Sequence, residues 1–168
     1  MPLFLPDLIL NKITDLSLDI LKKMNIKGIL LDVDSTLAEH GRQVPYEGVL
    51  EWLDMMQKNG IKLMILSNNN PQRVKPFADM LKLPFAADGL KPLPFKAKKA
   101  AEAMGISIKE TALAGDQVYT DILAGNLAGM KTILLQIPDI KESRFFQFKR
   151  AMEKPVRRAY YKKHGGNI

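Results

Sequence analysis

The chain has 168 residues, of which 46% are hydrophobic and 26% charged, as expected for one soluble globular domain. It contains no cysteine, so disulfides, thiolate metal sites and cysteine nucleophiles are excluded. The net charge of +7 comes from residues 141–168, which carry 9 basic and 2 acidic residues, whereas residues 1–140 carry 16 of each. We therefore expect a catalytic or binding domain over residues 1–140, with residues 141–168 as a basic extension of it.

The N-terminus is apolar but does not have the features of a targeting or membrane segment. MPLFLPDLIL lacks a basic flank and contains two prolines and Asp7, so it does not resemble a signal peptide. No run elsewhere approaches the roughly eighteen apolar residues that a spanning helix needs. We expect a cytoplasmic protein without a transmembrane segment, with peripheral attachment at the inner membrane face as an option.

Taken in chain order, the pattern predicts an N-terminal helical segment at about 7–24, with Ser17 capping its second part, and then alternating strands and helices. The predicted strands are 28–31, 61–66, 111–114 and 131–135, with 84–86 as a short fifth. The predicted helices between them are 47–58, 71–81, 94–104 and 120–128. Continuous apolar strands suit a sheet covered on both faces. The expected fold is α/β: a doubly wound parallel sheet of about five strands.

Chemically active residues follow these strands at the edge where such sheets bind ligands. They are Asp32 and Asp34 after the first strand, Ser67 and Asn68 after the second, Lys91 after the short piece, and Asp116 and Asp121 after 111–114. Each motif alone suits a surface turn, a helix cap or a solvated lysine. Their joint placement after successive strands favours a site.

The acidic residues predict a magnesium site. Asp32 and Asp34 stand at i and i+2 of an extended chain and point to the same side. Two charges so close require a cation or a shared proton, and Mg²⁺ prefers oxygen ligands. Asp116 and Asp121 would complete the acidic set.

An anionic substrate at this edge would need hydrogen-bond donors. The Ser67 hydroxyl, the Lys91 ammonium and the backbone amides of residues 33–34 and 67–68 could supply them. One carboxylate could then attack phosphorus while the other protonates the leaving oxygen.

Four stretches resemble the motifs of the haloacid-dehalogenase (HAD) superfamily of aspartate-nucleophile phosphohydrolases: LLDVDSTL, ILSNNN, GLKP and AGDQVYTDILAGNLAG. The resemblance implies Asp32 as nucleophile and Asp34 as acid/base. It implies Thr36, Ser67, Asn68 and Lys91 on the phosphate side, and Mg²⁺ held by Asp32, Asp116, Asp121 and the main-chain carbonyl of Asp34.

The motif sequences SNN, KPLP and GDQxxTDxxxGNxxG most resemble those of the YqeG-like group of HAD subfamily IIIA. Relatives in this group include mitochondrial phosphatidylglycerophosphate phosphatases. Ser35 departs from the asparagine that is more usual there. Lys96 is a rival to Lys91 for the lysine role.

The spacing of the motifs leaves no room for an inserted cap domain. Only 34 residues separate Asp32 from Ser67, and 23 separate Ser67 from Lys91. We therefore expect an open site that suits phosphate on a large or surface-bound molecule, unless a partner subunit forms a lid.

The basic C-terminal extension predicts an amphipathic helix over 140–154, ended by Pro155, with Phe145, Phe148 and Met152 on one side. It suits either a helix docked on the sheet with a solvated tail, or a segment that binds anionic lipid. Its composition suits RNA as well.

The sequence thus predicts a capless, Mg²⁺-dependent phosphatase that works through phospho-Asp32, with phosphatidylglycerophosphate as the substrate that the resemblance implies. The alternatives are a phosphatase of a soluble nucleotide or sugar phosphate, and a nucleic-acid-binding or ribosome-associated protein with incidental hydrolysis.

Overall fold

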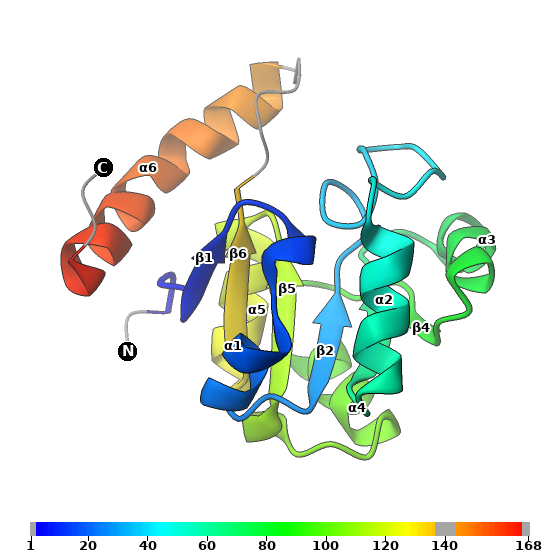
Figure 1. Ribbon diagram of the computed structural model, residues 1–168. Coiled ribbons are helices and arrows are strands. Elements are labelled where there is room, and N and C mark those ends of the chain that lie inside the picture. Colours follow the sequence, from blue (N-terminus) through cyan, green and yellow to red (C-terminus); the bar gives the residue numbers. More distant parts are fainter. Residues whose placement is uncertain (1–2, 137–143, 166–168) are drawn as a thin grey trace.

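A six-stranded sheet, parallel at every strand pair, forms the centre of the computed structural model, which describes residues 3–136 and 144–165 (Figure 1). The strand order is β1-β6-β5-β2-β3-β4. The strands are β1 (Leu8–Leu10), β2 (Gly28–Leu31), β3 (Lys62–Leu66), β4 (Phe85–Ala86), β5 (Thr111–Gly115) and β6 (Lys131–Leu135).

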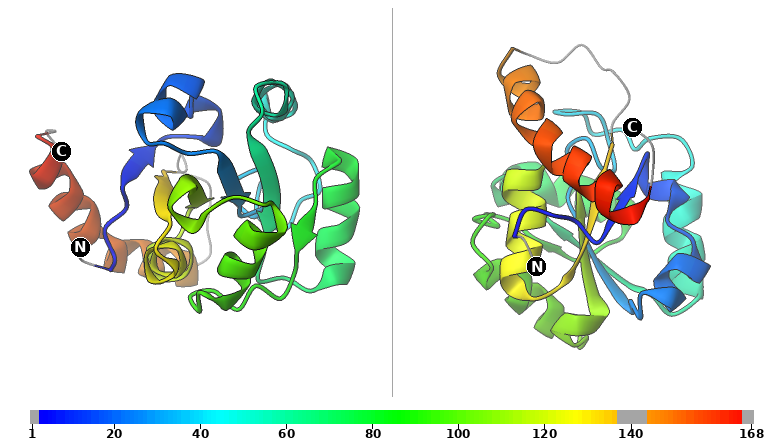
Figure 2. Two further views of the ribbon diagram at one scale, coloured as in Figure 1. Left: turned by 90° about the horizontal axis from the view of Figure 1, so that it is seen from below. Right: turned by 90° about the vertical axis from the view of Figure 1, so that its left-hand side faces the viewer.

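Helices cover both faces of this sheet, as the two further views make plain (Figure 2). They are α1 (Leu18–Lys23), α2 (Val49–Lys58), α3 (Pro71–Leu81), α4 (Phe95–Ala103), α5 (Leu123–Ala128) and α6 (Arg144–His164). Short helical turns occur at Ile13–Asp15 (η1), Ile108–Glu110 (η2) and Val118–Ile122 (η3), and the last of these is a π-helical turn that runs into α5. The predicted doubly wound α/β fold is confirmed.

The strand residues alternate between two buried layers, which explains their continuous apolar sequences. In β2, Ile29 and Leu31 pack in the layer beneath α1, α2 and α3, whereas Leu30 packs in the layer beneath α4 and α5. Burying such a side chain fully contributes roughly 1.5–3 kcal/mol. Both faces of each central strand therefore stabilise the same arrangement.

The sheet changes its winding direction between β2 and β5. From β2 the chain proceeds to β3 and β4 on one side, and it then returns to place β5 and β6 on the other. A switch of this kind opens a crevice beyond the carboxyl ends of the two strands. The residues that follow β2 and β5 are therefore placed side by side.

The prediction of a helical segment from residue 7 onward is wrong. Leu8–Leu10 form a strand that pairs with β6, and η1 follows before α1 begins after its predicted cap, Ser17. Asp7 fixes this pairing, because its carboxylate accepts a hydrogen bond from the Thr132 main-chain N–H at 2.9 Å. The sheet therefore has six strands, one more than predicted.

The C-terminal helix does not end at Pro155, contrary to prediction. α6 continues through Pro155 to His164. A proline inside a helix removes one hydrogen bond, at a cost of about 3 kcal/mol. The buried side chains of Glu153 and Tyr160 hold the helix on both sides of that point, since the first accepts from the Val118 N–H of η3 and the second from the Ile9 N–H of β1. The start predicted at residue 140 lies outside the described residues.

The connections between the strands contain no inserted domain within the described part of the chain. Residues 32–48 form a loop pinned by isolated β-bridges from Ala38 to Asp34 and Pro45, and α3 alone fills the space between β3 and β4. The expected absence of a cap therefore holds for residues 3–136. Among the described helices, none is both long and apolar enough to cross a bilayer.

Candidate active site

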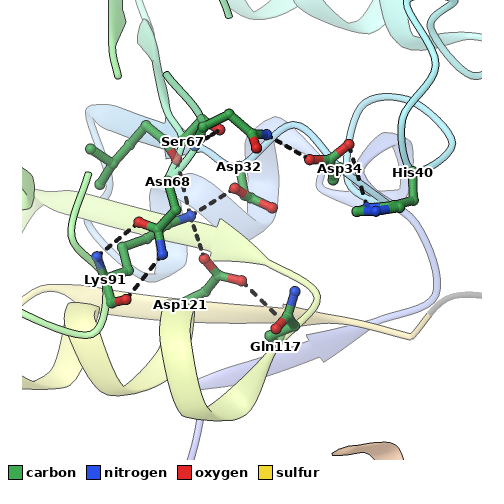
Figure 3. Close-up of polar contacts among 10 residues, drawn as sticks. Asp32, Asp34, His40, Ser67, Asn68, Lys91, Gln117 and Asp121 are labelled. Carbon is green, nitrogen blue, oxygen red and sulfur yellow. Dashed lines mark hydrogen bonds and ion pairs between the residues drawn. The ribbon is translucent and has the colours of Figure 1, made fainter. Parts of the chain in front are cut away.

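Three acids and a lysine meet at the carboxyl edge of the sheet, at the switch between β2 and β5. Figure 3 shows Lys91 with two of these acids, Asp32 and Asp121. Asp32 follows β2, Asp116 follows β5, and Asp121 projects from η3. Lys91 arrives from the loop after β4. The side chains that the sequence spread over 90 residues are thus neighbours.

Lys91 is the centre of the buried charge network. Its Nζ donates to Asp32 Oδ1 at 2.7 Å, to Asp121 Oδ1 at 2.6 Å and to the Leu66 carbonyl at 3.0 Å. An ammonium group has three donors, so all of them are used. In this structure Lys91 therefore compensates the acids, and its predicted contact with phosphate stays a prediction.

Burial and pairing shift the pKa of both members of this pair. Burial is the largest influence on Asp32 and, although Lys91 opposes it, raises the pKa of this carboxyl to about 7. Burial would lower the pKa of Lys91, but the carboxylates of Asp121 and Asp32 outweigh it and raise this pKa. Lys91 therefore stays charged, and Asp32, the candidate nucleophile, changes its protonation state near neutral pH.

The three buried acids fit a hard divalent cation. Asp32, Asp116 and Asp121 each offer a carboxylate oxygen, and these oxygens lie within 4.8 Å of one another. Lys91 neutralises only one of the three charges. Mg²⁺ binds through carboxylate oxygens and would compensate the surplus. The donor set thus fits the predicted ion, with Asp32, Asp116 and Asp121 as its side-chain ligands.

Asp34 points away from this cluster into a separate set of donors. Its Oδ1 accepts from the Gly41 main-chain N–H at 2.9 Å, and its Oδ2 accepts from Asn69 Nδ2 at 2.8 Å. Arg73 Nη2 and His40 Nδ1 lie 3.4 and 3.6 Å from the same Oδ1. These contacts hold the Asp34 side chain in a fixed position in the lining of the cleft.

Ser67 and Asn68 occupy the floor of the site, but their side chains bond to different parts of the protein. The Ser67 hydroxyl is buried and accepts from the Asn69 main-chain N–H at 3.1 Å. The Asn68 amide donates to the Lys91 carbonyl at 3.0 Å and accepts from the Lys91 N–H at 2.8 Å. The Asn68 side chain thus fixes the lysine loop.

Thr36 is not brought to the cleft. It is buried and lines a separate cavity of about 250 Å³ with Thr14, Tyr46 and Leu135. The alternation that places Asp32 and Asp34 on one side ends at Ser35, whose φ of +61° turns the chain. The structure therefore separates Thr36 from the other predicted phosphate ligands.

The comparisons with known proteins agree with this geometry. A family model described as haloacid dehalogenase-like hydrolase matches residues 29–129. This chain belongs to that family. This HAD hydrolase is 36% identical over 161 residues to the probable phosphatase YqeG of Bacillus subtilis (strain 168), an alignment that covers 95% of this chain and 93% of that protein.

Solved structures share the fold of this HAD hydrolase at low sequence identity. An uncharacterized protein from Listeria monocytogenes serotype 4b superposes with a TM-score of 0.57 at 20% identity, over 71% of this chain and 84% of the other. The cobalt-bound deoxy-D-mannose-octulosonate 8-phosphate phosphatase YrbI of Haemophilus influenzae gives a TM-score of 0.53 at 16% identity, over 83% and 91%. The prediction of a HAD-family phosphatase is thus confirmed.

The cleft of this HAD hydrolase also includes residues that the sequence did not single out. It has a volume of about 210 Å³, and its lining adds His40, Asn69, Gln117 and Thr120 to the predicted residues. His40 stands in a loop, where a histidine is more often uninvolved in a site. The isolated bridges of the 32–48 loop bring it beside Asp34, and neither helical nor strand periodicity in the sequence signals these contacts.

Proposed function

We propose that this protein is a Mg²⁺-dependent phosphomonoester hydrolase that forms an aspartyl-phosphate on Asp32. The observation that carries the proposal is the position of Asp32, which accepts a hydrogen bond from the Lys91 ammonium and belongs to the acidic cluster in an uncapped cleft. Activation of a carboxylate nucleophile requires a deprotonated oxygen, and a nearby ammonium favours that form.

Unused main-chain donors support a phosphate subsite at the same place. Within the described part of the chain, none of the hydrogen bonds uses the main-chain N–H of Val33, Asp34 or Asn68. These groups stand beside Asp32 and Ser67 on the floor of the cleft. Converging N–H groups are suitable ligands for phosphate oxygens.

In the first step, one carboxylate oxygen of Asp32 attacks phosphorus, the new P–O bond forms, and the ester P–O bond breaks. Asp34, in its protonated form, gives its proton to the leaving oxygen. The Gly41 and Asn69 donors hold Asp34 in place during this transfer.

In the second step, Asp34 as carboxylate takes a proton from water, whose oxygen attacks the phosphorus of phospho-Asp32. The bond between phosphorus and Asp32 breaks, phosphate leaves and the Asp32 carboxylate returns. Lys91 keeps Asp32 oriented throughout, through its hydrogen bond of 2.7 Å. The metal held by Asp32, Asp116 and Asp121 would supply charge neutralisation for the phosphoryl oxygens.

The uncapped cleft favours a phosphate on a large or surface-bound molecule, with phosphatidylglycerophosphate at the inner face of the cytoplasmic membrane as the first candidate. The solvent-facing side of α6 carries Lys154, Arg158 and Lys162 at i, i+4 and i+8. Such a row would attract anionic lipid. The face of α6 that carries Glu153 and Tyr160 packs on the protein, so attraction through this part would be electrostatic.

The substitution Asp32→Asn tests the chemistry. We expect the loss of at least about a thousandfold in Mg²⁺-dependent phosphomonoester hydrolysis, because an amide cannot attack phosphorus. Asp54→Asn, on the exposed face of α2, is the matched control and should keep full activity. Thermal unfolding should show both variants folded. Undiminished hydrolysis by Asp32→Asn would refute the nucleophile.

A substrate screen tests the second part of the proposal. Phosphatidylglycerophosphate in vesicles should be hydrolysed with a higher kcat/KM than soluble nucleotide and sugar phosphates. The reverse ranking would leave the chemistry intact and assign the protein to a soluble phosphometabolite. Specific RNA binding without hydrolysis of any phosphomonoester would favour the nucleic-acid alternative.

A further inference from the structure

Large apolar side chains stand exposed on both sides of the buried Lys91. Leu90, Leu93 and Phe95 expose 60%, 48% and 66% of their surface, whereas Lys91 exposes 6%. Single exposed apolar residues are normal on a protein surface, but three within six residues form a concentrated patch. This patch adjoins the proposed phosphatase site along the chain, because Leu90 directly precedes Lys91, which lines the cleft.

The loop that carries the patch is tied to the floor of the site. The Leu93 N–H donates to the Leu90 carbonyl at 2.8 Å, and the Gly89 N–H donates to the Ser67 carbonyl at 2.8 Å. The Asn68 side chain bonds both the main-chain N–H and the main-chain carbonyl of Lys91. The exposed side chains therefore have a fixed position relative to the cleft.

Leu90 is unfavourable in this place for the stability of the fold alone. Its φ of +55° lies in the left-handed region, where a residue with a branched side chain is uncommon. Its side chain gains little from burial in return. A strained residue beside an active site, with an exposed apolar side chain, points to a function outside the folded core.

A group of lysines adjoins the patch. Lys96, Lys98 and Lys99 occupy the first half of α4, whose only acidic residue is Glu102. Apolar side chains next to lysines form the usual surface of proteins that lie on anionic bilayers, because the first enter the acyl region and the second bind the headgroups.

We propose that residues 90–99 form the membrane-contacting surface of this protein, with an anionic lipid bilayer as the occupant. Leu90, Leu93 and Phe95 enter the acyl boundary, and the lysines of α4 bind anionic headgroups. This places the mouth of the cleft on the bilayer. The inference rests on the proposed phosphatase function only for the reason why the protein would bind a membrane, since lipid binding itself needs no catalysis.

Vesicle co-sedimentation tests the surface directly. The full-length protein should bind vesicles of equal parts phosphatidylcholine and phosphatidylglycerol, and bind them more tightly than pure phosphatidylcholine. The double variant Leu93→Ser/Phe95→Ser should bind at least about tenfold more weakly, because two apolar side chains no longer leave water. Met80→Ser is the matched control: its side chain is 48% exposed near the end of α3, which packs on the opposite face of the sheet from α4.

Fluorescence reports insertion independently of affinity. The protein has a single tryptophan, Trp52, which is a buried residue of α2 and gives a constant background. The variant Phe95→Trp should shift its emission to shorter wavelength when anionic vesicles are added. Met80→Trp should not.

Equal vesicle binding by Leu93→Ser/Phe95→Ser and the unmodified protein would overturn the proposal, and so would the absence of a spectral shift in Phe95→Trp. A dimer of the unmodified protein that the double variant cannot form would also overturn it, in favour of a second copy as the occupant. Hydrolysis of soluble p-nitrophenyl phosphate keeps the questions separate. If the unmodified protein binds vesicles but cleaves no phosphomonoester, the phosphatase proposal fails and the surface proposal stands.

Discussion

The proton on Asp32 connects the electrostatics of the site with its metal. The pKa of this carboxyl is raised by burial to about 7, so in the metal-free protein a proton occupies it below neutrality. A cation binds the deprotonated form and must displace that proton. Protonation and metal binding therefore compete at the same oxygen atoms.

We accordingly expect the affinity for Mg²⁺ to fall as the pH drops below about 7, by about tenfold per pH unit, and to level off above it. Calorimetric titration of the metal-free protein in buffers of different ionisation enthalpy would show the released proton. The Asp32→Asn variant removes the titrating group and should lose this pH dependence. The affinity of the unmodified protein for Mg²⁺ should therefore rise between about pH 5.5 and 7, which lies below the pKa of Asp32. A constant affinity over this range would contradict the assignment.

Gly115 makes room for one of the acids. A Cβ atom at this position would lie 2.3 Å from Cγ of Asp121, so the carboxylate would have to move. We expect Gly115→Ala to weaken Mg²⁺ binding and to cost about 1–3 kcal/mol in the free energy of unfolding. Gly28→Ala, at the start of the neighbouring strand β2, would meet Ile106 Cγ1 and Met104 Cε at 3.2 Å and no acidic side chain, so it serves as control. Equal Mg²⁺ affinity in the two variants would exclude this role of Gly115.

At the scale of residues, the sequence predicts the site residues that belong to a motif. It misses those that reach the cleft only through the path of a loop. Asp32, Lys91 and Asp121 follow strands or belong to recognisable sequence motifs. The order of the strands therefore predicts that these side chains lie close together. The places of Asn69 and His40 beside Asp34 depend on the path of the 32–48 loop. Gly41, whose φ is +77°, and the bridges of Ala38 set that path through contacts that no local pattern reveals.

At the scale of elements, α6 supports the turn that carries Asp121. The buried carboxylate of Glu153 accepts from the Val118 main-chain N–H at 2.8 Å, and the Tyr119 hydroxyl donates to the Met152 carbonyl at 3.0 Å. Val118 begins η3, in which the Gln117 N–H donates to Asp121 Oδ2 at 3.2 Å. The C-terminal helix thus holds the start of the segment that provides a metal ligand.

Glu153→Ala should weaken Mg²⁺ binding by roughly tenfold, because leaving a buried N–H unsatisfied costs about 1–3 kcal/mol. Glu153→Gln keeps an acceptor oxygen and should restore most of the affinity. Lys154→Ala, on the exposed side of the same helix, should match the unmodified protein. Mn²⁺ binding measured by electron paramagnetic resonance separates this effect from activity. If Ala, Gln and the unmodified residue give the same affinity, α6 does not position the metal ligands.

The elements themselves were predictable where their residues satisfy local rules. Asn70 accepts from the Arg73 N–H at 3.0 Å and begins α3 at the position that its sequence indicates. The two errors concern segments whose state depends on distant partners. Leu8–Leu10 suits a helix or a strand equally well until β6 pairs with it. Pro155 stays in α6 because contacts with η3 and β1 hold the helix on either side of that residue.

At the scale of the whole molecule, the charge of the C-terminal extension and the apolar patch near the cleft are separate features. The excess charge lies in residues 141–168, and in the described part of α6 it faces solvent. The patch of Leu90, Leu93 and Phe95 belongs to the catalytic domain. Salt should therefore weaken the attraction of the extension to anionic vesicles more than it weakens the apolar contact.

The contact of α6 with β1 has a further consequence. β1 is the outermost strand on its side, and its Ile9 N–H donates to the Tyr160 hydroxyl at 3.3 Å, on a side chain of α6 that is itself buried. Unpaired outer strands invite other chains to add to the sheet. Removal of residues 141–168 would expose this strand and favour self-association. A shortened protein that forms oligomers or precipitates would then report the loss of this shield rather than the loss of basic charge.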